Sequence, residues 1–309
     1  MVARSDTMGV EISFGITIPQ WASWSGAEGC RRIATAAEEF GYDWVGSGDH
    51  IVFSEAADSW DVDLPTLDVF ATLSFVAGAT ERITIGSNIC VVPYRHPVTL
   101  AKQAISLDVL SQGRFEFGVG SGWCESEFTV LDVPHHERGS RTDEFLALFD
   151  RACTEPIIDF CGPHHEFSGV GFYPRPCQDG GPPVMVGGFS APAFRRTAEF
   201  GDGWTLGTGD PSRVAEARKR ITTAWDDFDR DGEPAIAVNF GAHIDDSMDP
   251  DEHDSPLVGP TDAVIAGVEA FLEAGATRVS PGFTVRTDSI DEQVEQIERF
   301  ATAVMPSFN

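Results

Sequence analysis

The sequence predicts an α/β fold, a (β/α)8 TIM barrel with a loop-rich insertion before the fifth strand. Apolar, β-branched runs alternate with segments of helical periodicity along the chain. Strands that alternate with helices pair in parallel through crossover connections. The chain has 309 residues, 42% of them hydrophobic, and no linker or composition break divides it. Residues 1–309 are therefore expected to form one barrel domain.

The first half of the chain contains four strand-and-helix units. Its first strand is stopped by Pro19, and the helix after it is expected to end at Gly41, where glycine provides a C-terminal cap. The predicted strands are 11–18, 42–47, 82–92 and 114–119. The predicted helices between them are 26–40, 65–78 and 98–110.

The second half is less regular at its start. A helix is expected over 137–149, and residues 161–183 are rich in proline and glycine, which favours a loop or short hairpin. The predicted strands that follow are 183–188, 203–207, 235–244 and 276–280. The predicted helices are 193–200, 211–228, 261–273 and 289–304, and the acidic loop 245–254 is expected to be solvated.

The composition is strongly acidic, with 49 acidic and 21 basic residues and a formal net charge of −28. This balance excludes a nucleic-acid partner, because phosphate binding requires a basic face. The acidity indicates an enzyme adapted to high salt, and an ordinary acidic cytosolic enzyme is the alternative. An anionic ligand must find a local positive pole in this field.

No segment predicts export or membrane insertion. Residues 1–8 lack the apolar stretch of a signal peptide, and no later run approaches the roughly 18 apolar residues of a membrane helix. A cytoplasmic location is expected. The six cysteines form no C-x-x-C pair and are expected to be buried thiols in a reducing compartment.

Two glycine-rich loops follow predicted strands, where the site of such a barrel lies. Gly118-Val-Gly120-Ser-Gly122 has almost no side-chain bulk and would let a large, flat molecule approach the backbone. Residues 187–190, Gly-Gly-Phe-Ser, offer backbone N–H groups and a hydroxyl at a helix start, which is typical of an anion site. A structural turn with simple N-capping by Ser190 is the alternative.

The strand ends carry few groups for direct chemistry. They show no metal motif, no G-x-S-x-G elbow and no lysine, so a cofactor that brings its own reactivity is favoured. His50 is the best acid/base candidate, since its ordinary pKa lies near ~6.5 and it follows a strand. Beside Asp49, it could instead be a satisfied hydrogen-bonding residue. The pairs at 135–136 and 164–165 lack a third ligand, so no metal is expected.

Several stretches together resemble the bacterial luciferase-like flavin oxidoreductases. They span roughly residues 11–281 and are specific for the superfamily, less so for the substrate. They are Asp49-His50, Arg82-Ile-Thr-Ile-Gly-Ser-Asn-Ile89, residues 94–103, residues 107–123, Arg138-Gly-Ser-Arg-Thr-Asp-Glu144, residues 182–188 and Gly201-Asp-Gly-Trp204.

The resemblance implies a barrel that binds FMN or the deazaflavin coenzyme F420, and the residues around Gly187 and Arg138 are closest to the F420 branch. A cis peptide bond is expected between Asn88 and Ile89. The residues that match the cofactor site are Gly187, Gly188, Phe189 and Ser190 at the phosphate and Asp49, His50, Asn88, Ile89, Gly120 and Ser121 around the ring.

The implied reaction is hydride transfer to or from a small organic substrate, with His50 as the group that exchanges a proton. Trp123 stands where some sugar-phosphate-oxidising relatives have glutamate, which favours an apolar pocket walled by Trp21 and Trp123. A homodimer is expected from the resemblance alone. The alternatives are an FMN-dependent monooxygenase, an isomerase or aldolase that binds a phosphorylated substrate, and a non-catalytic flavin-binding protein.

Overall fold

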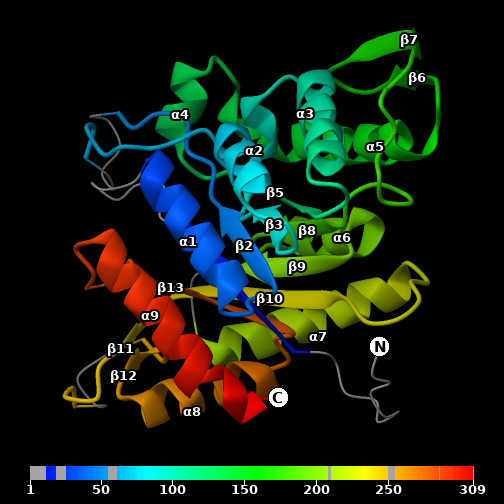
Figure 1. The fold of residues 1–309 in the computed structure, drawn as a ribbon. Helices are drawn as coiled ribbons and strands as arrows, with labels where there is room; N and C mark the ends of the chain where they lie inside the picture. Colours follow the sequence, from blue (N-terminus) through cyan, green and yellow to red (C-terminus); the bar gives the residue numbers. More distant parts are fainter. Residues whose placement is uncertain are drawn as a thin grey trace.

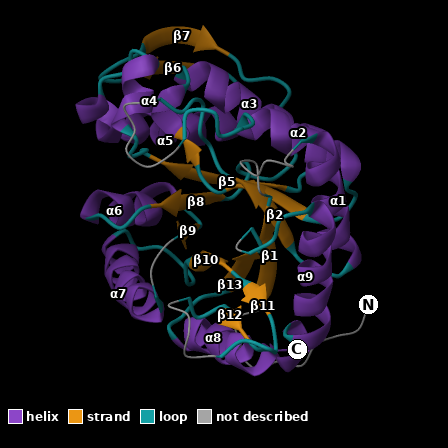
Figure 2. Cartoon of the chain, turned by 90° about the vertical axis from the view of Figure 1, so that its left-hand side faces the viewer, coloured by secondary structure: helices purple, strands orange, loops and turns teal. Residues whose placement is uncertain are grey.

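Parallel strands close into a barrel with helices around it, as the sequence predicted (Figure 2). The computed structural model describes residues 12–18, 26–54, 61–207, 210–249, 255–284 and 286–308. Pairing between β3 and β5 closes the ring. The barrel strands are β1 (Ser13–Thr17), β2 (Trp44–Ser47), β3 (Thr84–Ser87), β5 (Phe115–Gly120), β8 (Val184–Gly187), β9 (Gly203–Leu206), β10 (Ala235–Gly241) and β13 (Arg278–Gly282).

The helices pack on the outer face of the barrel (Figure 1). Side chains cap several of them: Asp68, Ser190, Asp210 and Ser289 each accept a hydrogen bond from the first turn of the helix that follows. The helices are α1 (Ala27–Glu39), α2 (Val69–Ala79), α3 (Pro97–Leu110), α4 (Glu125–Val130), α5 (Arg138–Thr154), α6 (Ala191–Phe200), α7 (Pro211–Asp227), α8 (Thr261–Glu273) and α9 (Ile290–Ala303). Short 3-10 turns occupy Val92–Tyr94, His135–Glu137 and Met305–Phe308.

The third barrel strand is interrupted, which corrects the prediction of one long strand over 82–92. It runs as β3, breaks at Asn88 and Ile89, and resumes as β4 (Cys90–Val91), which pairs with β5. The peptide bond between Asn88 and Ile89 is cis, so that prediction is confirmed. The last two residues of the predicted strand 235–244 likewise form a separate piece, β11 (His243–Ile244), paired with β12 (Val258–Gly259).

The insertion before β8 is a hairpin. Strands β6 (Ile158–Cys161) and β7 (Glu166–Val170) pair antiparallel and lie outside the barrel beyond α5 (Figure 1). The predicted loop or hairpin is therefore confirmed, with its first strand beginning before residue 161. The loop 245–254 is described only to residue 249.

Alternation along the strands separates the core from the barrel interior. On β5, Phe117 faces outward and packs 5.2 Å from the Phe149 ring of α5. Glu116, next to it, faces inward and forms two hydrogen bonds of 2.8 and 2.7 Å with Arg278. The Arg278 guanidinium lies 4.5 Å from the centre of the Trp44 ring, so a large aromatic and an ion pair fill the interior far from the barrel mouth.

All six cysteines are free thiols, but Cys161 and Cys177 are exposed, which corrects the prediction that all are buried. Cys161 points outward because the hairpin buries only alternate residues of β6. None of the helices in the described ranges combines the length and apolar character that a bilayer crossing requires.

Candidate functional site

His50 lies beyond the end of β2 and is held by a buried carboxylate from α4. Its Nδ1 is 2.8 Å from Oε2 of Glu127. The other oxygen of Glu127 accepts the backbone N–H of Ile51 at 2.7 Å, and Tyr94 donates its hydroxyl to Oε2 at 2.9 Å. The Glu127 side chain has no exposed surface, whereas 15% of the His50 side chain is exposed.

The hydrogen bonds decide the charge of this carboxylate. Burial alone would raise the pKa of Glu127, but the bonds from His50, Ile51 and Tyr94 outweigh it and hold the pKa below its ordinary value. Burial and the neighbouring Glu127 raise the pKa of Tyr94 well above its usual range. Glu127 is therefore an anion that accepts from four donors, the fourth being the backbone N–H of Val52 at 3.4 Å.

Asp49 is not a partner of His50. Its two oxygens accept from Arg95 at 2.6 and 2.9 Å, and one also accepts the backbone N–H of Val91 at 2.8 Å. Arg95 also binds Asp68, 2.7 Å away. Burial alone would lower the pKa of Arg95, but its bonds to Asp49 raise it above its usual value. Asp49 thus ties the end of β2 to β4 and α3.

Ile89 packs against two glycines at the mouth of the barrel. A Cβ added to Gly120 would lie 1.8 Å from Cδ1 of Ile89, and one added to Gly187 would lie 3.0 Å from its Cγ2. Neither position has room for a larger residue. The structure thus brings together Ile89, Gly120 and Gly187, three of the residues that the sequence analysis assigned to the cofactor.

Asn88 belongs to a polar triad inside the barrel. Its Oδ1 is 3.2 Å from the hydroxyl of Thr205 and 3.3 Å from Nδ2 of Asn239. Asn239 also donates to Thr205 at 2.9 Å. The Oδ1 of Asn239 is buried without a hydrogen-bond partner. Thr205 and Asn239 follow no motif, and only the barrel places them beside Asn88.

A cavity of about 390 Å³ lies at the start of α6. Gly187, Gly188 and Ser190 line it, together with Ser121 from the loop after β5. Two arginines, Arg138 and Arg196, also line it. The sequence predicted only backbone N–H groups and a hydroxyl for an anion at the start of α6. The structure adds two guanidinium groups, where lysine is absent.

Arg196 is fixed rather than mobile. It is 6% exposed, binds Asp143 at 2.7 Å and donates to the Ser121 hydroxyl at 3.3 Å. Ser190 caps α6 by accepting the N–H of Ala193 at 3.3 Å, so the capping alternative is confirmed for its side chain. Gly188 has a φ of 116°, a conformation that favours glycine.

Phe189 points away from this cavity. Its ring packs 5.5 Å from Phe194 and 6.3 Å from Trp204, and the Arg213 guanidinium lies 4.4 Å from its centre. The side chain therefore anchors the glycine turn to α6 and α7, and only its backbone could reach a ligand.

Aromatic rings surround His50. Phe53 lies 5.2 Å from its ring and Trp123 lies 6.1 Å away, edge to face. Trp123 is 60% exposed at the rim, while Phe53 is buried. Trp21, the other predicted wall of the substrate pocket, falls outside the described residues.

One of the two histidine pairs, His164 and His165, lies in the turn of the β6–β7 hairpin. His165 bonds to Glu144 at 2.5 Å, and the backbone N–H of His164 bonds to the same carboxylate at 2.6 Å. Within the described ranges no group of three or more His, Cys, Asp and Glu side chains is arranged to hold a metal ion.

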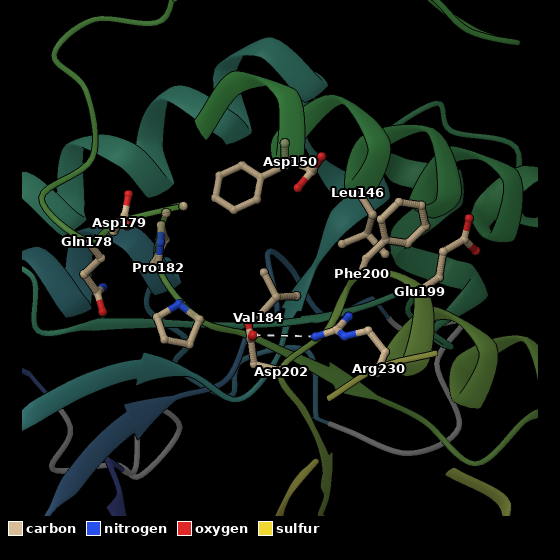
Figure 3. Close-up of a pocket in the computed structure, with 14 residues that line it drawn as sticks. Leu146, Asp150, Gln178, Asp179, Pro182, Val184, Glu199, Phe200, Asp202 and Arg230 are labelled. Carbon is tan, nitrogen blue, oxygen red and sulfur yellow. Dashed lines mark hydrogen bonds and ion pairs between the residues drawn. The ribbon is translucent and has the colours of Figure 1, made fainter. Parts of the chain in front are cut away.

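A second cavity, of about 580 Å³, lies at the opposite end of the barrel, where β8 begins (Figure 3). Four acids reach it, and Arg230, which lies 3.9 Å from Asp202, is the basic residue among those that line it. None of the predicted site residues lines this cavity. Acidic side chains outnumber basic ones here, whereas two arginines line the cavity at α6. The acids are Asp150, Asp179, Glu199 and Asp202.

Sequence reasoning missed Glu127, Tyr94, Arg138 and Arg196 as site residues. Glu127 lies on α4, a helix of six residues that is too short to show a periodic pattern and was not predicted. The one available signal was position, since Glu127 closely follows the glycine loop after β5. Arg138 and Arg196 lie within the predicted helices 137–149 and 193–200. Arginine is common in helices, so neither residue indicated a site.

The fold and the site define the class as a closed parallel barrel with an arginine-lined cavity at the strand ends, an arrangement that is typical of barrel enzymes. Residues 12–255 match the family described as luciferase-like monooxygenase. The chain belongs to this family. It is 27% identical over 290 residues to an uncharacterized protein of Mycobacterium tuberculosis, an alignment covering 88% of this chain and 93% of that one.

Solved structures share the fold. Monooxygenase RslO1 from Streptomyces bottropensis superposes with a TM-score of 0.83 at 20% identity, covering 96% of this chain and 100% of that one. An F420-dependent secondary alcohol dehydrogenase, solved with an F420-acetone adduct, superposes with a TM-score of 0.81 at 15% identity. That match covers 97% of this chain and 100% of the dehydrogenase.

Proposed function

We propose that this luciferase-like oxidoreductase uses coenzyme F420 to transfer hydride to or from a small organic substrate. The observation that carries the proposal is the arrangement at the mouth. The arginine-lined cavity at α6, the Ile89 side chain on Gly120 and Gly187, and the His50–Glu127 pair all lie around the strand ends. The fold shared with an F420-dependent secondary alcohol dehydrogenase supports the choice of carrier.

The residues fit such a carrier. Gly187, Gly188 and Ser190, with Arg138 and Arg196, would hold its phosphate. The Ile89 side chain, which lies directly on Gly120, would back its ring, while the contact of Gly120 with the carrier stays a prediction. The predicted contacts of Asp49, Asn88, Ser121 and Phe189 with the carrier stay predictions.

The chain's own part in the reaction is proton transfer and exclusion of water. A flavin or deazaflavin supplies the ring that carries the hydride. His50 exchanges a proton with the reacting oxygen of the substrate. Phe53 and Trp123 beside it form an apolar wall, which favours an apolar or aromatic substrate.

An FMN-dependent monooxygenase is the second candidate, favoured by the family description and by the fold shared with RslO1. Titration with each carrier separates the two. The proposal expects F420 to bind more tightly than FMN, read by quenching of carrier fluorescence, and F420-linked oxidation of an alcohol. Tight FMN binding with NAD(P)H-driven oxygen uptake would replace the proposal.

Replacing His50 tests catalysis against mere binding. The His50→Ala and His50→Gln variants are expected to bind the carrier with unchanged affinity while turnover falls by about 10²- to 10⁴-fold. A wild-type protein that binds F420 but turns over with no alcohol or carbonyl compound would instead be a flavin-binding protein.

We also propose that two copies pair through the outer face of α2 and α3. Helix α2 has no charged residue, and the one charged residue exposed on α3 is Lys102. Phe75 is 44% exposed and Leu110 69% exposed on these helices, beside a groove of about 560 Å³. On a chain of net charge −28, an apolar face with few charged side chains is where like copies meet with least repulsion.

Light scattering after size exclusion tests this pairing. The wild type is expected at twice the chain mass, and the Phe75→Arg, Leu110→Arg double variant at the chain mass. Val130→Arg, at a residue 59% exposed on α4, is the control and should leave the mass unchanged. A wild-type monomer at micromolar concentration contradicts the proposal.

A further inference from the structure

Glu127 is the buried partner of His50, and four donors fix its position. The carboxylate lies under the loop after β2 and accepts from His50, Ile51, Tyr94 and Val52 at 2.8, 2.7, 2.9 and 3.4 Å. Since two of these donors are backbone N–H groups, the carboxylate is anchored to the segment that carries His50. A rotation of either side chain would break a bond in a site without exposed carboxylate surface.

The protons in this group can be assigned from its chemistry. An ionised carboxylate has no hydrogen to give, so every close contact to it must be made by a donor. Tyr94 therefore donates its hydroxyl, and His50 donates the hydrogen on Nδ1. In the neutral imidazole the lone pair then lies on Nε2, because only one nitrogen carries the hydrogen.

We propose that Glu127 is a positioning residue that fixes the ring plane of His50 and its tautomer with hydrogen on Nδ1. The proposal rests on the proposed function, in which His50 exchanges a proton with the substrate. With the lone pair on Nε2, neutral His50 is the form that accepts the proton of a substrate hydroxyl, so the test is made in the direction of alcohol oxidation.

The oxidation balances with these groups. The alcohol's O–H bond would break and its proton would go to Nε2 of His50, while the carbinol C–H bond would break and its hydrogen would leave with the electron pair, for which a bound flavin or deazaflavin would be the acceptor. The product is a carbonyl compound. The imidazolium formed is stabilised by the Glu127 anion behind it, as in sites where a carboxylate orients a histidine base.

The neighbouring groups do not compete for this role. Asp49 is occupied by Arg95 and Val91. Phe53 and Trp123 contact the His50 ring and carry no carboxylate. Glu127 is thus the carboxylate that contacts His50 among the described residues.

The variant Glu127→Gln should invert the tautomer while keeping the shape of the side chain. The amide oxygen is required opposite the Ile51 N–H, which places the NH2 group against Nδ1 of His50. Nδ1 must then accept, so the hydrogen moves to Nε2 and the base is lost. Turnover with an alcohol is expected to fall about 10²-fold, with KM changed less than about threefold.

The tautomer is read by ¹⁵N nuclear magnetic resonance of imidazole nitrogens in the protein without carrier. The chain has eight histidines, and the spectrum of His50→Gln identifies the signals of His50. The wild type is expected to carry hydrogen on Nδ1, and Glu127→Gln on Nε2. Wild-type His50 with hydrogen on Nε2 overturns the proposal even if the variant does not fold.

The matched control is Glu125→Gln, the same substitution on the same helix. The Glu125 side chain is 77% exposed and lies 3.9 Å from His135, so the tautomer of His50 should stay as in the wild type and turnover should change less than about threefold. Equal loss of turnover in both variants with no change of tautomer overturns the proposal. If the tautomers behave as expected but wild-type protein oxidises no alcohol, the proposed function fails while the positioning assignment stands.

Discussion

Arg138 is a half-buried arginine in a chain crowded with acids. Its guanidinium donates to the backbone oxygen of His135 at 2.9 Å and lines the α6 cavity. In the part of the chain that the structure describes, no carboxylate lies within ion-pair distance of it. Arg195 and Arg196 nearby both bind Asp143, so Arg138 is the cavity arginine whose charge is least compensated.

The Arg138→Gln variant should weaken binding of a phosphorylated carrier by about tenfold, the effect of losing one charge-assisted hydrogen bond. Fluorescence titration with FMN and with riboflavin measures it, because riboflavin lacks the phosphate. Arg220→Gln, on the outer face of α7, is the control. Equal losses for FMN and riboflavin would show that Arg138 does not contact the phosphate.

The buried Glu127 carboxylate predicts a pH-dependent stability. Its pKa is lowered in the folded protein, whereas an unfolded glutamate titrates near ~4.3. The unfolded chain binds the proton first as the pH falls, so the stabilisation is complete above the unfolded pKa and is lost as the pH falls through the folded one. Denaturant unfolding from pH 7 to about pH 3 should show a constant difference between wild type and Glu127→Gln down to about pH 5, and a difference that shrinks below ~4.3. A difference that stays constant over the whole range would contradict this.

At the scale of the elements, close approach of backbones decides where glycine is required. A Cβ added to Gly118 of β5 would lie 1.9 Å from the carbonyl oxygen of Ser87 on β3. That oxygen belongs to backbone and cannot move without disturbing the closure of the barrel at β3 and β5. The same crowding recurs at Gly46, where the Trp44 ring would lie 1.9 Å away.

The Gly118→Ala variant is expected to lose about 3 kcal/mol or more of the free energy of unfolding, because the clash is with main chain. Urea denaturation monitored by tryptophan fluorescence measures the loss. Gly207→Ala has no neighbour within 4 Å of the added atom and should change stability by less than about 0.5 kcal/mol. Similar stabilities for both variants would refute the role assigned to the close contact.

The elements that the sequence predicted well are those whose pattern is long. Helices such as α7 and α9 carry apolar residues at helical spacing, and capping by Asp210 and Ser289 marks their starts. The break after β3 and the six-residue α4 have no such pattern. Contacts with other strands and loops determine the break after β3 and the position of α4. A pattern of neighbouring residues carries no information about such contacts.

At the scale of the whole molecule, charge is the unusual property. A net charge of −28 makes the folded chain repel itself, and salt weakens that repulsion. Two of the chain's few basic side chains, Arg138 and Arg196, lie together at the α6 cavity. Adaptation to high salt stays a prediction.

The melting temperature should therefore rise with potassium chloride, by several degrees between ~0.01 M and ~1 M, where the Debye length falls from ~30 to ~3 Å. Thermal unfolding followed by circular dichroism measures it. Sucrose at equal osmolality controls for effects unrelated to charge. A melting temperature that stays flat or falls with salt would contradict the role of self-repulsion.

The sequence by itself determined the barrel, its family resemblance and the glycine loops at its mouth. Each of these is local: a strand or helix period, a proline or glycine at a boundary, a run such as 187–190. It also identified His50, because a histidine just beyond a strand end lies at the mouth of any such barrel.

Only the tertiary structure decided which groups act on those residues. Glu127 reaches His50 across 77 positions of sequence, Arg95 reaches Asp49 across 46, and Asn239 reaches Asn88 across 151. The closure of the barrel sets these contacts, and no periodicity records them. Hydrogen bonds between distant segments therefore fixed the charge of Glu127 and made Asp49 a structural anchor, while the chain order left both roles open.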